Sequence, residues 1–178
     1  MAALSPSLLH ASQVRPVDLE QMTSRAARIF SGRCTGSRVE RDPTLQRDVV
    51  VATFRVQRAV KGVEGHTVTV RMLASPSAAQ GDEAPGVPSF KTGEEVVLFL
   101  YGDSPLGLTS PVGLGQGRFR IFKDKQGRKV ALNDFANARL IPAEGSRGGA
   151  AVGKHRPPAP IDPDDLLDRA ARIAGGRH

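Results

Sequence analysis

The chain has 178 residues, a formal net charge of +7, a single cysteine and no tryptophan. Its length suits one domain with tails, and one cysteine excludes an intrachain disulfide and a cysteine-rich zinc site. No apolar run approaches the roughly 18 residues that a transmembrane helix requires, so the sequence predicts no membrane span. The basic residues are scattered singly among acidic ones, which is typical of a solvated surface.

The N-terminal segment 1–16 is expected to be a leader or the remainder of a signal segment. It is rich in small and apolar residues, as the last part of a secretory signal is, but it has neither a basic start nor a long apolar centre. Two alternatives stay open: a disordered leader, or a signal encoded upstream of Met1. Leu19, Met22 and Ala26 then recur at helical spacings, which predicts a short helix over residues 17–26.

Alternating apolar and polar residues predict a series of short strands. An extended pattern covers residues 28–40. Strict alternation follows over residues 50–57 until it slips at Arg58 and Ala59, where we expect a bulge or a final turn. Residues 67–72 alternate again after a tight connection, so the last two segments are predicted to pair as an antiparallel hairpin.

A long irregular segment, residues 74–92, separates these strands from the rest of the chain and is predicted to be a surface loop. Residues 96–101 are apolar on both faces, which indicates a strand covered on two sides at the centre of the core. A second irregular connection, residues 102–113, leads to a second predicted hairpin over residues 117–132.

Five to six short strands with few helices are typical of a mainly β protein. The best match is a small OB-like antiparallel barrel over residues 17–142, with a short N-terminal helix and a C-terminal helix, and a β-sandwich is the alternative. Residues 143–160 have the composition of a flexible linker, and residues 161–175 have the apolar stripe and acidic first turn of an amphipathic helix. Whether this helix docks on the barrel or stays mobile is left open.

Five segments in a fixed order carry a resemblance to a known group of proteins. They are ARIFSGRCTG, ATFRVQRAVKG, TVTVRM, GVPSFKTGEEVVLFL and GLGQGRFRIF. Over residues 19–132 the set resembles uncharacterised exported bacterial proteins with an OB-like, netrin/TIMP-like barrel. The resemblance implies this fold and a periplasmic or secreted location. It also implies structural roles for the matching residues, which are Gly32, Phe54, Val56, Lys61, Gly62, Phe90, Gly93, Glu94, Phe99, Gln116, Gly117 and Phe119.

The glycine-rich stretch GLGQG, residues 113–117, allows three interpretations. Alternate glycines leave backbone amides bare for a phosphate when they join a strand to the N-terminus of a helix. They also suit the start of a strand in a nucleic-acid platform, or a corner of a sheet. Because a strand and not a helix is predicted after them, we favour the corner, with glycine allowing close backbone packing.

Four arginines of the predicted strands, Arg55, Arg71, Arg118 and Arg120, are expected to point outward. If their strands are neighbours, they form a basic stripe that contacts an anion or nucleic acid. OB barrels bind single strands by stacking bases on exposed aromatic side chains above such a groove. The aromatic residues here are expected in the core, with no second aromatic set facing outward. Single-stranded nucleic-acid binding is therefore the alternative function and not the first.

The sequence has no motif for catalysis, a cofactor or a metal. Its four histidines are far apart, and no spacing typical of a zinc enzyme or a nucleophile elbow occurs. Glu94 and Glu95 start a strand, so their side chains are expected on opposite faces rather than sharing a proton. We therefore predict a protein that is not an enzyme, with no catalytic residues, no metal ligands and no cofactor.

The sequence thus predicts a non-catalytic binding module, periplasmic or secreted, that recognises a protein or an envelope component through the loops 74–92 and 102–113. The alternative is a single-stranded nucleic-acid-binding protein that uses the arginine stripe. A protease-inhibitor-like module is a third interpretation, although the N-terminal cysteine with which metalloproteinase inhibitors of the wider fold grip zinc has no counterpart here.

Overall fold

The computed structural model describes residues 16–75, 89–138, 140–141 and 159–176. Its elements are α1 (Leu19–Arg25), β1 (Arg28–Asp42), β2 (Arg47–Lys61), β3 (Thr67–Leu73), β4 (Glu95–Leu100), the 3-10 helix η2 (Leu114–Gly117), β5 (Arg118–Lys123), β6 (Lys129–Asn133) and α2 (Pro163–Gly175). Most of the predicted leader 1–16, of the loop 74–92 and of the linker 143–160 lies outside the described residues.

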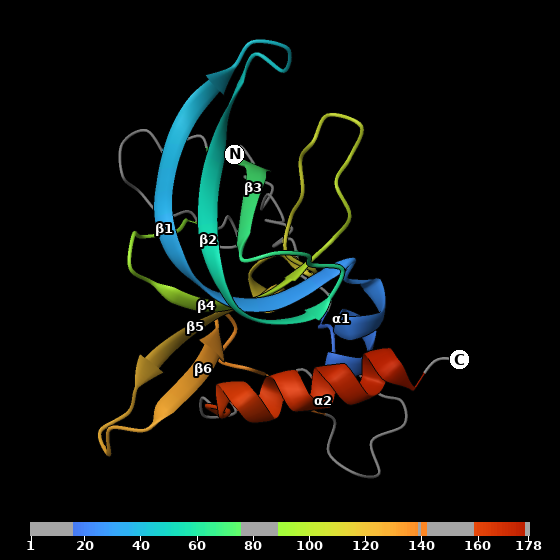
Figure 1. Cartoon of the computed structure of the whole chain (residues 1–178), viewed down its shortest axis with the longest axis vertical. Coiled ribbons are helices and arrows are strands. Elements are labelled where there is room, and N and C mark those ends of the chain that lie inside the picture. The colour runs from blue at the N-terminus through green and yellow to red at the C-terminus, as the bar shows by residue number, and fades with distance from the viewer. Residues whose placement is uncertain (1–15, 76–88, 139, 142–158, 177–178) are drawn as a thin grey trace, which may run out of the picture.

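The six strands form one antiparallel sheet in the order β3-β2-β1-β4-β5-β6 (Figure 1). Strands β1 to β4 make a Greek key, because β1, β2 and β3 follow one another as hairpins and β4 returns by a long connection to lie beside β1. The mainly β class and both predicted hairpins are confirmed. The sheet is not closed into a barrel, because β3 and β6 stay at its two edges without pairing with each other.

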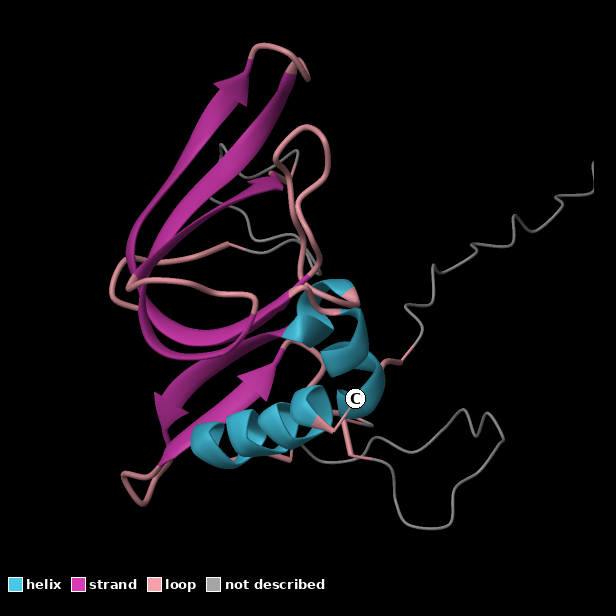
Figure 2. Ribbon diagram, turned by 45° about the vertical axis from the view of Figure 1, so that its right-hand side comes forward, coloured by secondary structure: helices cyan, strands magenta, loops and turns pink. Residues whose placement is uncertain are grey.

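The long hairpin of β1 and β2 is bent by three shifts of register. Gln57 and Val60 of β2 and Thr35 of β1 each lack a Cα partner on the opposite strand. Such bulges increase the local twist and let a strand curve, and Figure 2 shows the hairpin curving strongly along its length. The bulge expected at Arg58 and Ala59 is confirmed, with one extra residue on either side of this pair.

Strand β4 lies between two apolar cores, one on each face of the sheet. Val96, Leu98 and Leu100 belong to a core shared with β1, β2 and β3, which we name the strand core. Val97 and Phe99 belong to a core shared with β5, α1 and α2, which we name the helix core. Because both faces of β4 are buried, the central strand that the sequence predicted is confirmed.

Both helices cover the same side of the sheet (Figure 2). Asp18 caps α1 and Asp162 caps α2, each by accepting hydrogen bonds from backbone amides of the first turn. Leu166, Leu167 and Ala170 of α2 are buried in the helix core. The C-terminal helix therefore docks on the sheet, which answers the question that the sequence left open.

The glycines of the GLGQG stretch permit close packing, as predicted. A Cβ on Gly115 would lie 2.5 Å from the carboxylate of Asp134, and a Cβ on Gly117 would lie 2.6 Å from the carbonyl oxygen of Val112. Gly113 adopts a left-handed φ of 64°, which favours glycine. Protein atoms thus occupy the space beside these glycines, and η2 leads directly into β5.

Candidate functional site

The loop 101–110, between β4 and η2, is the first candidate surface for a partner. It projects beside β3 instead of lying flat on the sheet (Figure 1). Leu106 near its tip is 50% exposed, and Tyr101 at its base and Leu73 at the end of β3 are also exposed. We refer to the loop 101–110 together with Leu73 as the loop surface.

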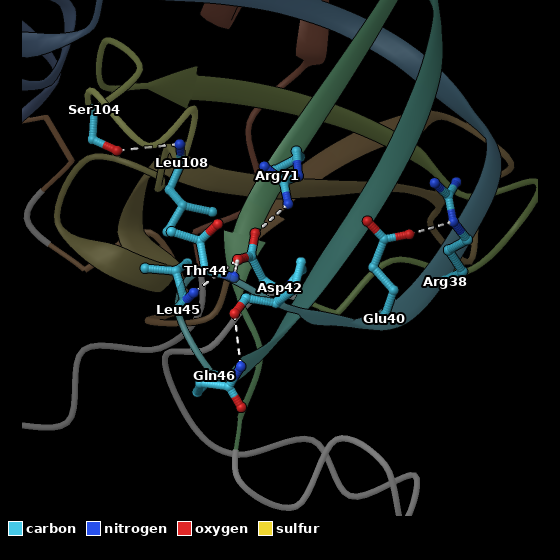
Figure 3. Close-up of polar contacts among 10 residues, drawn as sticks. Arg38, Glu40, Asp42, Thr44, Leu45, Gln46, Arg71, Ser104 and Leu108 are labelled. Carbon is cyan, nitrogen blue, oxygen red and sulfur yellow. Dashed lines mark hydrogen bonds and ion pairs between the residues drawn. The ribbon is translucent and has the colours of Figure 1, made fainter.

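The loop is ordered by its own hydrogen bonds. The amide of Ser104 donates to the carbonyl of Leu108 at 2.8 Å, and the hydroxyl of Ser104 accepts from the amide of Leu108 at 3.2 Å (Figure 3). At the base, the amide of Thr109 donates to the carbonyl of Arg71 at 2.8 Å. The hydroxyl of Thr109 donates to the carbonyl of Tyr101 at 2.7 Å. The loop therefore has a defined shape and covers part of the edge of β3.

Arg71 joins the loop surface to the turn between β1 and β2. Its guanidinium donates to Asp42 at 2.6 Å (Figure 3), and a Cβ on Gly107 would lie 3.9 Å from the same guanidinium. Asp42 also accepts hydrogen bonds of 2.9 Å from the amides of Thr44 and Leu45. The hydrogen bond from the Leu45 amide lowers the pKa of Asp42 most, and the hydrogen bond from Arg71 is the next largest cause. A charged carboxylate thus fixes the turn beside the loop.

The four arginines predicted to form a stripe lie on two faces of the sheet. Arg55 of β2 and Arg71 of β3 share one face, which continues across β1 and β4 to Ile121 of β5. Arg118 and Arg120 alternate with Ile121 along β5, so they lie on the opposite face. In addition, β1 and β4 separate β2 from β5. The structure therefore does not bring the four residues together.

The prediction that Arg118 points outward is wrong. Its side chain is 2% exposed, and its guanidinium carbon lies 5.1 Å from the centre of the Phe90 ring. The nearest carboxylate, Glu94, is 3.5 Å away, and Nε of Arg118 has no hydrogen-bond partner among the described residues. Arg120 is partly exposed and lies 3.5 Å from Asp134. Both faces of β5 are covered at its start, so Arg118 turns toward the strand core although it occupies a polar position of the alternating pattern.

Glu94 and Glu95 point to opposite faces, as predicted. Glu94 lies on the face that carries Arg118. Glu95 lies on the other face, where it forms an ion pair with Arg33 and accepts hydrogen bonds from Lys129 and Gln57. The Lys129 ammonium holds the pKa of Glu95 below its usual range, although burial acts in the opposite direction. Sequence analysis missed Arg33, because only the pairing of β1 with β4 places it directly beside Glu95.

The expectation that Tyr101 lies in the core is wrong, and two phenylalanines are exposed as well. Phe122 is 45% exposed, and Tyr101 and Phe135 are also exposed. Tyr101 follows the last residue of β4, and Phe122 lies where β5 extends beyond its pairing with β4. The apolar patterns of these strands run past the end of the core, so their last aromatic residues reach solvent.

The described ranges contain side chains of the types that bind metals or act as nucleophiles. No three His, Cys, Asp or Glu side chains come together there as a metal site requires. Cys34 is buried, and burial raises the pKa of its thiol, which disfavours the reactive thiolate. None of the helices in these ranges has the length and apolar character to cross a bilayer.

No protein-family model and no curated protein matches the chain. The residues that carry the sequence resemblance nevertheless have identifiable packing roles. Gly62 has a left-handed φ of 59°, and a Cβ there would lie 2.1 Å from the carbonyl oxygen of Ala27. Phe90 packs edge-on against Phe54, with ring centres 5.0 Å apart. These contacts stabilise the fold and do not identify a ligand.

Proposed function

We propose that this protein is a non-catalytic interaction module that recognises a macromolecular partner, a protein or an envelope component, through the loop surface. The observation that carries the proposal is a loop ordered by its own hydrogen bonds with Leu106 half exposed near its tip. Burial of such a side chain against a partner gains on the order of 25 cal/mol per Å² of apolar area. The preformed loop also loses little conformational entropy on binding.

The proposal also assigns the sheet to an OB-like fold. The OB fold is a partly open, five-stranded Greek-key barrel that binds ligands on strands 2 and 3 and on the loops after strands 1 and 4. The Greek key of β1 to β4, with β5 beside β4, supports this assignment. Under this assignment the loop surface corresponds to the ligand-binding side of the OB fold, which the contacts of Arg71 of β3 with Asp42 at the end of β1 and with the loop after β4 support.

Export to the periplasm or beyond is the second part of the proposal, and the order of the resembling motifs supports it. Protease treatment of intact and of permeabilised source cells tests it. A protein outside the cytoplasm is degraded without lysis of the inner membrane. Full protection until that membrane is lysed contradicts export and leaves the proposal for the loop surface standing.

Leu106→Asp tests the loop surface, with Leu114→Asp as a matched control. Leu114 lies in η2 and is 46% exposed, close to the 50% of Leu106. Both variants are expected to keep the wild-type stability within about 0.5 kcal/mol, because both sites are on the surface. Affinity capture from envelope and culture fractions, quantified by mass spectrometry, should give partners kept by wild type and Leu114→Asp and lost by Leu106→Asp. Identical capture by all three proteins contradicts the proposal.

A further inference from the structure

The distal half of β1 is a second surface that is open to a partner. Strand β4 pairs with β1 over residues 28–33, and the Gly93 amide continues this pairing to the Cys34 carbonyl. Residues 36–42 of β1 pair with β2 on one side, and no described strand lies on their other side. This part of the hairpin projects beyond the rest of the sheet with β1 on the outside (Figure 2). We refer to residues 37–41 as the β1 edge.

Alternate backbone groups of the β1 edge point away from β2. The amide of Ala74 donates to the carbonyl of Asp48, so the even-numbered residues of β2 bond to β3 over this stretch. Their odd-numbered neighbours therefore bond to β1, where even-numbered residues lie opposite them. The amides and carbonyls of Ser37, Val39 and Arg41 consequently point to the open side, and they have no hydrogen-bond partner in the part of the chain that the structure describes.

The two outer edges of the sheet are less open than the β1 edge. At β3, the carbonyl of Arg71 accepts a hydrogen bond of 2.8 Å from the amide of Thr109. At β6, Ala131 and Ile161 exchange hydrogen bonds of 2.7 and 3.2 Å. Segments of the same chain thus cover part of each outer edge, which is a common protection against unwanted strand pairing. Among the described residues, the β1 edge has no such cover.

The side chains of the β1 edge are complementary to a second copy of the same strand. Val39, which is 43% exposed, lies between Arg38 and Glu40. The two charged side chains share one face, where Nε of Arg38 donates to the Glu40 carboxylate at 2.9 Å (Figure 3). When two copies pair antiparallel with Val39 opposite Val39, Arg38 of each copy lies opposite Glu40 of the other. Opposite charges at such positions stabilise strand pairing.

This central register, with Val39 opposite Val39, is favoured over its neighbours. The outward backbone groups of the two copies meet only when the strands are shifted by an even number of residues. A shift of two residues in one direction places Arg38 opposite Arg38, and the same shift in the other direction places Glu40 opposite Glu40. Like charges directly opposite each other are destabilising, so both shifted registers are disfavoured.

We propose that two copies of this chain associate through the β1 edge as an antiparallel, two-fold symmetric strand pair. The same residues of both copies form the contact, as in other isologous dimers. The outward backbone groups hydrogen-bond across the contact, Val39 packs against Val39 of the second copy, and Arg38 and Glu40 set the register. A second copy is the favoured occupant because the charge pattern of the edge is complementary to itself. The proposal does not depend on the loop surface.

Sedimentation velocity of the whole chain between about 10 μM and 1 mM measures this association. The contact is shorter than a standard interface of roughly 1,600 Å², so the wild type is expected to dimerise with a dissociation constant on the order of 100 μM. Arg38→Glu and Glu40→Arg each replace two favourable cross-strand pairs by two repulsive ones. Each variant alone is therefore expected to self-associate at least about tenfold more weakly than wild type.

An equimolar mixture of Arg38→Glu and Glu40→Arg tests the register. One copy then carries acidic side chains at both positions and the other carries basic side chains at both, so unlike charges again lie opposite each other. The mixture is expected to associate at least as tightly as wild type. Both variants keep a positive net charge, because one substitution changes the wild-type +7 by only two units. Attraction between the net charges of the two variants therefore does not explain the recovery.

The matched controls reverse charges on α1, which lies away from the projecting hairpin (Figure 1). Glu20 and Arg25 are exposed in this helix. Arg25→Glu and Glu20→Arg change the net charge as the two test variants do, and they are expected to associate like wild type, both alone and mixed.

Four results overturn the proposal. A wild type that stays monomeric at about 1 mM excludes the dimer at the strength expected of such a contact. Self-association of Arg38→Glu and Glu40→Arg as strong as that of wild type assigns the contact to another surface. An equal loss in the α1 controls assigns the association to net charge. A mixture of the two test variants that associates no better than each alone contradicts the central register.

Discussion

At the scale of single residues, Arg118 shows that the environment of a side chain depends on what covers both faces of its strand. A guanidinium removed from water requires compensation, which the Phe90 ring and the Glu94 carboxylate provide. Glu94 itself is less dependent on this contact, because it is partly exposed and lies 3.7 Å from Arg120. Removal of the Glu94 charge should therefore lower the free energy of unfolding more than removal of the buried Arg118.

Glu94→Gln is expected to lower the free energy of unfolding by about 3 kcal/mol, because it leaves the guanidinium of Arg118 buried without an anion. Arg118→Met is expected to cost about half as much, since methionine fills the apolar space beside Phe90 and Glu94 keeps Arg120. Urea unfolding followed by circular dichroism measures both values. A larger loss in Arg118→Met than in Glu94→Gln contradicts this explanation.

At the scale of elements, Glu95 links four strands of the sheet. It belongs to β4 and contacts Arg33 of β1, Gln57 of β2 and Lys129 of β6. Because its pKa is lowered in the folded chain, its charge stabilises the fold above its unfolded pKa of about 4.3. This contribution is lost as the pH falls through the lower pKa of the folded state.

Glu95→Gln is therefore expected to be less stable than wild type at neutral pH, and the difference is expected to shrink toward zero at pH values below the lowered pKa of the folded carboxyl. In that range the wild-type carboxyl is protonated and resembles the amide. Denaturant unfolding of both proteins across the acidic range gives the two stability curves. A stability difference that does not change with pH is incompatible with stabilisation by the charge of Glu95.

Helix α2 is the second element with a defined contribution to stability. Leu166 is fully buried in the helix core, and Leu166→Ala is expected to lower the free energy of unfolding by about 3 kcal/mol. Asp164→Ala, one turn or less away, is the control. Its side chain is 82% exposed and lies 3.8 Å from Arg58, so its loss is expected to stay below about 1 kcal/mol. Equal losses in both variants contradict the docking of α2.

At the scale of the whole molecule, the sequence predicted the strands better than their arrangement. Alternation located the hairpin of β2 and β3 with its inward residues, and the apolar run at residues 96–101 located the central strand. Alternation along one strand says nothing about which strands are neighbours. The long connection before β4 permits several return positions, so the order of the strands and the open form of the sheet were not predictable.

The candidate site was less predictable than the fold for the same reason. Arg118 follows the alternating pattern, but Phe90 covers the face that the pattern assigns to solvent. The pair of Arg33 with Glu95, and the closeness of Arg33 to Arg55, follow from the register of β1 with its two neighbours. Arg33 does not stand out in the sequence, because long-range register is not encoded in any local motif.

One cooperative sheet, with β4 buried between two cores, supports both proposed surfaces. Native-state hydrogen exchange of individual amides measures this most directly, because the slowest amides exchange only through global unfolding. The amides of residues 96–100 in β4 are expected to exchange last, with those of the edge strands β3 and β6 and of the loop 101–110 exchanging earlier. Faster exchange in β4 than in the edge strands would contradict a central strand covered on both faces.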